Sequence, residues 1–180
     1  HLAGIGTDTL AGNTEGAATE AWADGHVADR LDHSFAQVLD EWETSGNEVS
    51  NVMEEAGEAF PFQLFVDQWT HGWDIRATLG ESAAARPDLS VYEHFLDDFM
   101  AAVQGQASEA TSALTLQVGD KQCELGTGAS AGELTLDLFE FARISMGRRS
   151  QRQLEALSWP AAVTDPGTYI DALVFWSVND

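Results

Sequence analysis

The sequence Asp67-Gln-Trp-Thr-His-Gly-Trp-Asp74 (DQWTHGWD) lies within a segment, Phe60 to Leu79, whose apolar residues recur three and four positions apart. This spacing is typical of one face of a helix, and Gly80 supplies a stop signal. On such a helix Asp67 and His71 are neighbours, and Asp74 follows one turn later. A carboxylate and an imidazole at this distance can contact the same metal ion.

Helical patterns continue on both sides of this segment. The residues from Val27 to Trp42 form an amphipathic pattern, which we expect Gly46-Asn47 to interrupt before it continues to Gly57. After the central segment, Pro87 opens another apolar stripe that ends near Gly105. The chain is therefore predicted to be mainly α, with a helical bundle over residues 1–107.

The pattern changes after residue 108. Residues 112–125 (SALTLQVGDKQCEL) alternate apolar and polar side chains around Gly119-Asp120, which predicts a β-hairpin. We expect a flexible connection over 126–132, a helix from Leu134 to Met146 and a short helix ending near Leu157. Residues 108–180 are thus predicted to form a small C-terminal α+β region.

The charge of the chain limits its partners. Thirty acidic residues against eight basic ones give a formal net charge of −22, which repels nucleic-acid phosphates and anionic lipid headgroups. No apolar run approaches the ~18 residues that span a bilayer. Cys123 is the single cysteine, which favours a reducing, cytoplasmic location. Such an acidic, lysine-poor composition is either adaptation to high salt or ordinary acidity.

Asp67 and His71 would need a third ligand to hold a metal, and the sequence offers His1. Two imidazoles and a carboxylate leave one coordination position for water or substrate, which suits a catalytic divalent metal. Asp74 would then orient an imidazole or a substrate. The alternative is that Asp67 and His71 only form the polar side of a helix, with Asp74 paired to Arg76 or unpaired.

Other polar residues are weaker candidates. Arg148-Arg149 is the densest positive point in the chain and could bind a substrate carboxylate, or could simply end the helix that begins at Leu134. We interpret His26, His33 and His94 as surface or boundary histidines, and Cys123 as a structural thiol.

Three segments resemble one family. His1-Leu-Ala-Gly4 is similar to the "HLAG" of the mycothiol-dependent maleylpyruvate isomerase family, a branch of the DinB-like metalloenzymes. HGWDIRATLG (71–80) resembles its "HxWDxxxALG" segment, and residues 141–159 (FARISMGRRSQRQLEALSW) resemble the tail of many members. The three matches occur in the family's order and together frame almost the whole chain.

The resemblance implies a four-helix bundle that holds a divalent metal, usually zinc, on His1, Asp67 and His71. The family usually has Glu where this chain has Asp67, whose side chain is one methylene shorter. The family's first helix precedes "HLAG", so we expect the sequence to lack that helix and to leave an apolar groove. The implied partners are a small-molecule substrate and the thiol cofactor mycothiol.

Three functions remain open from the sequence. The first is a metal- and thiol-dependent isomerase or transferase in which the metal lowers the pKa of the thiol. The second is a non-catalytic metal-binding or interaction bundle. The third takes His1 as an N-terminal copper ligand, as in oxidative polysaccharide-cleaving enzymes, but those are β-sandwiches and this sequence predicts helices.

Overall fold

The computed structural model describes residues 1–17, 19–56, 63–80 and 89–175. Contacts between Cα atoms divide the chain into two compact units, His1–Leu64 and Phe65–Asp180, and each is described by itself. The described residues are mainly helical with one three-stranded sheet, which confirms the predicted mainly α class. None of the described helices is both long and apolar enough to cross a membrane.

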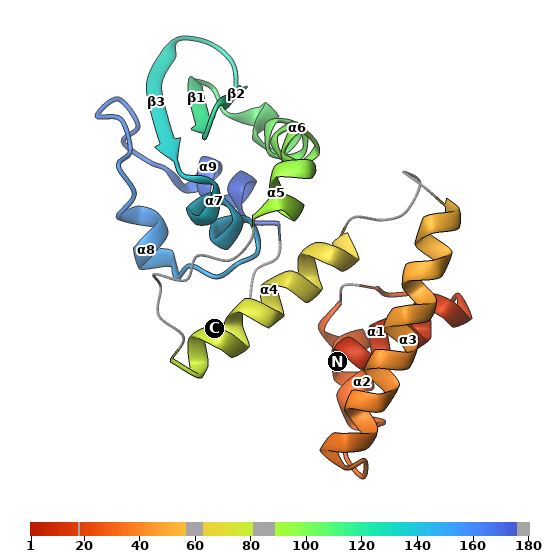
Figure 1. Ribbon diagram of the computed structural model, residues 1–180. Helices are drawn as coiled ribbons and strands as arrows, with labels where there is room; N and C mark the ends of the chain where they lie inside the picture. The colour runs from red at the N-terminus through yellow and green to blue at the C-terminus, as the bar shows by residue number, and fades with distance from the viewer. Residues whose placement is uncertain (18, 57–62, 81–88, 176–180) are drawn as a thin grey trace. The chain divides into compact units, whose positions relative to one another are not determined.

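The first unit consists of α1 (Leu2–Ala11), α2 (Glu20–Ala28) and α3 (Phe35–Ala56). Figure 1 shows α1 packed against α3, and α1 also contacts α2. Small residues make this packing close, because a Cβ added to Gly6 would lie 2.5 Å from the Ser45 Oγ on α3. The apolar residues that α1 buries are few, so polar contacts add to the joining of these helices.

Glu41 on α3 is the centre of one such polar contact. Its carboxylate accepts hydrogen bonds from the Arg30 guanidinium, with an Nε to Oε2 distance of 2.9 Å, and from the Thr7 hydroxyl at 2.9 Å. Arg30 also donates to the backbone oxygen of His26 at 2.8 Å. A single carboxylate therefore links α1, the end of α2 and α3.

The predicted break at Gly46-Asn47 is wrong, because α3 continues through both residues without interruption. Glycine in a helix costs only about 1 kcal/mol relative to alanine, which the rest of a 22-residue helix outweighs. The chain turns instead between Ala28 and Phe35.

The signal for that earlier turn is a capping box. The Ser34 Oγ accepts from the Gln37 backbone N–H at 3.3 Å, and the Gln37 side chain accepts from the Ser34 backbone N–H at 2.8 Å. The turn also removes Leu31 and Phe35 from the predicted apolar stripe, and their exposed fractions are 76% and 78%.

The helix α4 (Gln63–Thr78), which belongs to the second unit from Phe65 onward, confirms the predicted central helix over its described residues. It buries Val66, Thr70 and Trp73, which are spaced three and four positions apart. Trp69 packs edge-on against Tyr92 of α5 (Ser90–His94), with ring centroids 5.0 Å apart. Trp73 packs against Phe139 of α7 (Leu138–Ser145) at 5.3 Å. These contacts orient α4 within its unit.

The predicted hairpin is confirmed as β1 (Ala113–Val118) and β2 (Lys121–Leu125), which pair antiparallel. A third strand, β3 (Ser130–Leu136), pairs parallel with β1 on its other side. The expected flexible connection therefore ends before Ser130 and not at Gly132, and the expected helix is present as α7 but begins at Leu138, not at Leu134. Leu134 and Leu136 alternate at strand spacing, and Asp137 caps α7 by accepting from the Glu140 N–H at 2.8 Å.

Two glycines make this short route from β2 to β3 possible. The loop passes around the start of β1, where the Thr127 N–H donates to the Ala110 oxygen at 2.9 Å. Gly126 and Gly128 have φ values of 82° and 102°, and a Cβ on either would lie within 2.5 Å of a backbone oxygen of residues 111–112. Both positions of the loop therefore require glycine.

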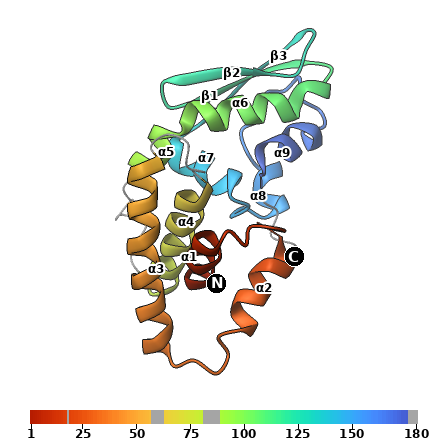
Figure 2. The ribbon, with the colours of Figure 1, turned by 90° about the vertical axis from the view of Figure 1, so that its right-hand side faces the viewer.

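One face of the sheet is buried by helices. Figure 2 shows the sheet lying across α6 (Leu96–Gln106), with α9 (Gly167–Leu173) on the same side. The 3-10 helix η2 (Ala107–Glu109) follows α6, and α8 (Gln151–Glu155) follows α7. The helix α6 packs on β2 and α9, and it therefore belongs to the same unit as the sheet. We had expected α6 in the helical bundle over residues 1–107.

Candidate functional site

The two predicted ligands of the central helix lie on one unbroken element. Asp67 and His71 both belong to α4, four residues apart, and Asp74 is three residues beyond His71. These positions share one side of the helix, next to the side that buries Val66, Thr70 and Trp73. His71 is half-buried, and the side chain of Asp67 lies outside the described part of the structure.

His1 lies at the start of α1, in the first unit, against two aromatic side chains. Its Nδ1 is 3.2 Å from the Nδ1 of His26, and the two rings stack with centroids 5.3 Å apart. Trp22 meets the His1 ring edge-on at 6.1 Å. The Trp22 indole N–H is buried and has no acceptor among the described residues.

The three predicted ligands are therefore divided between the units. His1 belongs to the first, and Asp67 and His71 belong to the second. Within the described residues, no group of three or more His, Cys, Asp or Glu side chains is arranged to hold a metal ion. The set of His1, Asp67 and His71 stays a prediction.

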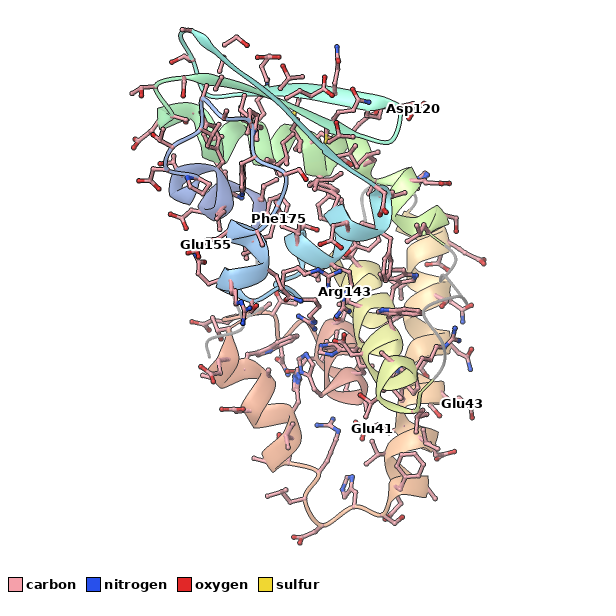
Figure 3. The ribbon with its side chains drawn as sticks, turned by 90° about the vertical axis from the view of Figure 1, so that its left-hand side faces the viewer. Glu41, Glu43, Asp120, Arg143, Glu155 and Phe175 are labelled. Carbon is pink, nitrogen blue, oxygen red and sulfur yellow. The ribbon has the colours of Figure 1, made fainter. Side chains whose placement is uncertain are left out.

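Asp74 has two partners that the sequence did not indicate. Its Oδ1 accepts from the Arg143 Nη1 at 2.7 Å, and its Oδ2 accepts from the Arg148 Nε at 2.8 Å. Figure 3 shows Arg143 between α7 and α4. Burial raises the pKa of Asp74, but the hydrogen bonds from the two arginines outweigh it, so the pKa lies below its usual value. The sequence interpretations, pairing with Arg76 or no partner, are replaced by this cluster.

The end of α7 explains how Arg148 reaches Asp74. The Arg148 N–H donates to the Arg143 oxygen at 2.7 Å, and the Gly147 N–H donates to the Ile144 oxygen at 2.9 Å. With Gly147 at a φ of 67°, this is a Schellman motif. It reverses the chain directly after α7 and places Arg148 on the same side as Arg143, one turn away.

Arg149 has a different role from Arg148. Its Nε and Nη2 donate to the two oxygens of the Glu140 carboxylate, with an Nε to Oε1 distance of 2.7 Å. This bidentate pair neutralises Arg149. Arg143 and Arg148, in contrast, share the single carboxylate of Asp74, so the cluster carries one more positive than negative charge.

Tyr92 of α5 lies against α7 and was not a candidate from the sequence. It is fully buried, and its hydroxyl is 3.5 Å from the Ala142 oxygen. Burial raises the pKa of Tyr92 far above its usual value, against the lowering effects of Thr70, Ser145 and the two arginines. The phenol therefore remains protonated and acts as a donor. An aromatic residue in an apolar stripe gives no sequence signal for this position.

His26 was interpreted as a surface or boundary histidine, and this is wrong. Only 4% of it is exposed, and its Nε2 lies 2.9 Å from the Asp8 Oδ2. His33 and His94 are exposed, as expected.

Cys123 lies on β2 and is half-buried, with its Sγ 3.9 Å from the Met100 oxygen. Burial, together with the neighbouring Glu124, raises the pKa of the thiol to about 11. Because the thiolate is the reactive form, this environment agrees with a structural role.

The chain was also compared with known proteins. No family model, curated protein or solved structure matches it. The candidate site is therefore argued from the residues of this chain.

Proposed function

We propose that the chain is a metal- and thiol-dependent enzyme, an isomerase or transferase of the maleylpyruvate isomerase type on a DinB-like bundle. One observation carries the proposal: a single continuous helix holds Asp67, His71 and Asp74 on one side, and two arginines fix Asp74. The resemblance of residues 1–4, 71–80 and 141–159 to that family supports it.

The chemistry of the predicted ligands suits a divalent metal. Two imidazole nitrogens from His1 and His71 and one carboxylate from Asp67 are ligands that zinc accepts, with a position left for a further group. When bound, the metal would lower the pKa of the thiol and polarise a substrate carbonyl. The buried indole N–H of Trp22, close to His1, supports a bound group that offers an acceptor atom.

Arg143 and Arg148 would bind and orient the substrate. Arg143 and Arg148 share one carboxylate, so their excess positive charge suits a substrate that carries a carboxylate. Asp74 holds each of the two guanidinium groups by one hydrogen bond. The side chains of Arg143 and Arg148 are 16% and 15% exposed, so a substrate carboxylate would meet them in a partly desolvated site, where charge pairing is stronger than in water.

The test measures metal and thiol binding separately. We expect zinc to bind the chain stoichiometrically, and mycothiol to raise the melting temperature only when zinc is bound. Asp67→Ala and His71→Ala should each lower zinc affinity at least tenfold. His94→Ala, at an exposed histidine of the same unit, is the control and should leave the affinity unchanged.

Catalysis is then measured as thiol-dependent isomerisation of maleylpyruvate, with Arg148→Ala expected to raise KM. Zinc binding without any effect of mycothiol would favour the alternative, a non-catalytic metal-binding or interaction bundle. No zinc binding by the wild-type chain, or equal affinity in Asp67→Ala, would contradict the proposed site.

A further inference from the structure

The rings of His1 and His26 face each other with the same kind of nitrogen. The two Nδ1 atoms are 3.2 Å apart, and the ring centroids are 5.3 Å apart. The difference between these distances is close to twice the distance from the centre of an imidazole to one of its nitrogens. Both Nδ1 atoms therefore lie on the facing edges of their rings, where a single bound atom could contact both.

The spacing of the two nitrogens fits a metal ion. Zinc binds imidazole nitrogen at about 2.0–2.1 Å, so two imidazole nitrogens on one tetrahedral zinc are about 3.3 Å apart. Zinc and copper accept imidazole ligands, whereas magnesium and calcium prefer oxygen. Two imidazoles leave further coordination positions open, and water can occupy them.

Metal binding requires an Nδ1 without a proton on both rings. Without metal, one of the two nitrogens can donate a hydrogen bond to the other. A metal would displace that proton, whichever ring carries it. Because the site uses only the two Nδ1 atoms, the further contacts of His1 do not have to change.

Asp8 on α1 lies where a carboxylate can orient His26. Its Oδ2 is 2.9 Å from the Nε2 of His26, the ring nitrogen that does not face His1. When the Nδ1 of His26 binds a metal, the proton of the ring is on Nε2 and can be donated to Asp8. Metal-binding histidines commonly donate their second N–H to a carboxylate, which fixes the ring and makes it a better ligand.

Packing holds the ring of His26 in place. A Cβ at Gly4 would lie 2.3 Å from the His26 Cγ, so the ring lies directly against the backbone of α1. Trp22 also contacts the ring, with centroids 4.2 Å apart and planes at 65°. The indole N–H of Trp22 is buried without an acceptor among the described residues, and a water bound to the metal is a possible acceptor.

We infer that His1 and His26 bind one divalent metal ion through their Nδ1 atoms, and that Asp8 is a positioning residue that orients His26. The inference goes beyond the proposed function, in which the ligands are His1, Asp67 and His71. His1 is common to both sets, so His26 is either a further ligand of the same metal or an alternative to the residues of α4. Variants of each set distinguish these two cases.

The first experiment titrates the full chain with zinc chloride and follows the histidine nitrogens by long-range ¹H–¹⁵N NMR. We expect the Nδ1 atoms of His1 and His26 both to bind zinc, and the Nε2 of His26 to keep its proton. His33 is exposed and serves as the internal reference, whose resonances should not change. Magnesium chloride should not reproduce the changes. If zinc does not bind, or binds without affecting the Nδ1 of His26, the inference is overturned.

The second experiment measures the zinc affinity of variants by isothermal titration calorimetry, with circular dichroism to show that each is folded. Asp8→Ala should lower the affinity about 10- to 100-fold. His26→Phe keeps a ring but removes both nitrogens, so it should lower the affinity further. His33→Ala is the matched control in the same unit and should change nothing. Wild-type affinity in folded His26→Phe would overturn the metal site, and wild-type affinity in folded Asp8→Ala would overturn the positioning role.

The same measurement on Asp67→Ala and His71→Ala separates this inference from the proposed function. A loss of affinity in His26→Phe but not in these two variants supports the inference and contradicts the proposed ligand set. A loss in all three variants supports both, with His26 as a further ligand of the same metal. A loss only in Asp67→Ala and His71→Ala overturns the inference and leaves the proposed function standing.

Discussion

Asp74 illustrates how strongly one carboxylate can order its surroundings. Arg143 and Arg148 approach it from the end of α7, and Asp74 itself belongs to α4, so the cluster joins two helices of the second unit. The Asp74 side chain is only 34% exposed. Removing its carboxylate would leave both guanidinium groups without their negative partner. The contribution of Asp74 to folding is therefore larger than that of a surface ion pair.

We expect Asp74→Asn to lower the free energy of unfolding by about 1–3 kcal/mol, because two partly buried arginines lose their negative partner. The measurement is urea unfolding at pH 7. Asp97→Asn is the matched control, since Asp97 pairs with Lys121 and its side chain is 76% exposed. That exposed pair should contribute much less, because solvent screens both charges. Equal effects of the two substitutions would contradict this prediction.

The effect of Asp74→Asn should also depend on pH. The pKa of Asp74 is lower in the folded than in the unfolded chain, where it is about 3.9. Its contribution is therefore complete well above pH 4 and is lost as the pH falls through the lowered folded pKa. The difference in unfolding free energy between wild type and Asp74→Asn should be constant from pH 6 to 8 and shrink below pH 4. A difference that grows on acidification would exclude this linkage.

Cys123 should react slowly with alkylating reagents in the folded chain. With its pKa raised from 9.0 to about 11, the thiolate fraction at pH 8 is about 100-fold lower than for an ordinary thiol. We expect iodoacetamide modification, followed by mass spectrometry, to be slower by about this factor than in the urea-unfolded chain. Equal rates in the two states would show that the strand does not protect the thiol.

The residue scale also shows what the sequence could predict of the site. The spacing of Asp67, His71 and Asp74 was sufficient to place all three on one helix. The partners of Asp74 were not predictable, because Arg143 and Arg148 are 69 and 74 residues away in sequence and reach it through a Schellman turn. His26 was missed for a similar reason, since its partner Asp8 is 18 residues away on another helix.

At the scale of secondary-structure elements, glycine has opposite effects in α1 and α3. A Cβ at Gly46 in α3 would lie within 4 Å of no described atom outside the adjacent residues and the backbone of its own helix. A Cβ at Gly6 in α1 would lie 2.9 Å from the Ser45 Cβ and 2.5 Å from its Oγ. A side chain can therefore be added at Gly46 of α3 without a clash, whereas Gly6 of α1 has to remain glycine.

This contrast gives a paired prediction. Gly46→Ala should stabilise the chain by about 0.5–1 kcal/mol, because alanine reduces the entropy that the helix loses on folding. Gly6→Ala should destabilise it by about 1–3 kcal/mol, because the new methyl forces α1 away from α3. Thermal and urea unfolding measure both. If Gly46→Ala destabilises the chain, α3 is interrupted at Gly46 as its sequence first suggested.

The elements differ in how far local sequence determines them. The hairpin of β1 and β2 was predictable because alternation and the Gly119-Asp120 turn both act locally. The continuity of α3 was not, because its capping box and length outweigh a glycine that looks like a break. β3 was missed because its pairing with β1 depends on a loop that returns around the strand, not on a turn next to it.

At the scale of the whole molecule, charge dominates. The thirty acidic residues far outnumber the eight basic ones, so the net interaction among the charges is repulsive. Several of the basic residues are already held in ion pairs with Asp74, Glu41, Glu140 and Asp97. No Asp or Glu of the described residues is buried, so salt can screen the uncompensated acids. Their repulsion is a property of the sum of charges and not of any single contact.

We therefore expect the melting temperature at pH 7 to rise steadily as NaCl increases from about 0.01 M to about 1 M. The Debye length falls from about 30 Å to about 3 Å over this range, so repulsion between surface carboxylates is removed while the partly buried ion pairs are screened less. The same titration near pH 4.2, the isoelectric point, is the control, because the net charge there is close to zero. Salt should have a much smaller effect at that pH, and what remains measures the general effect of salt on apolar burial. A melting temperature that is insensitive to salt at pH 7, or equally sensitive at both pH values, would show that net repulsion does not limit the stability of this chain.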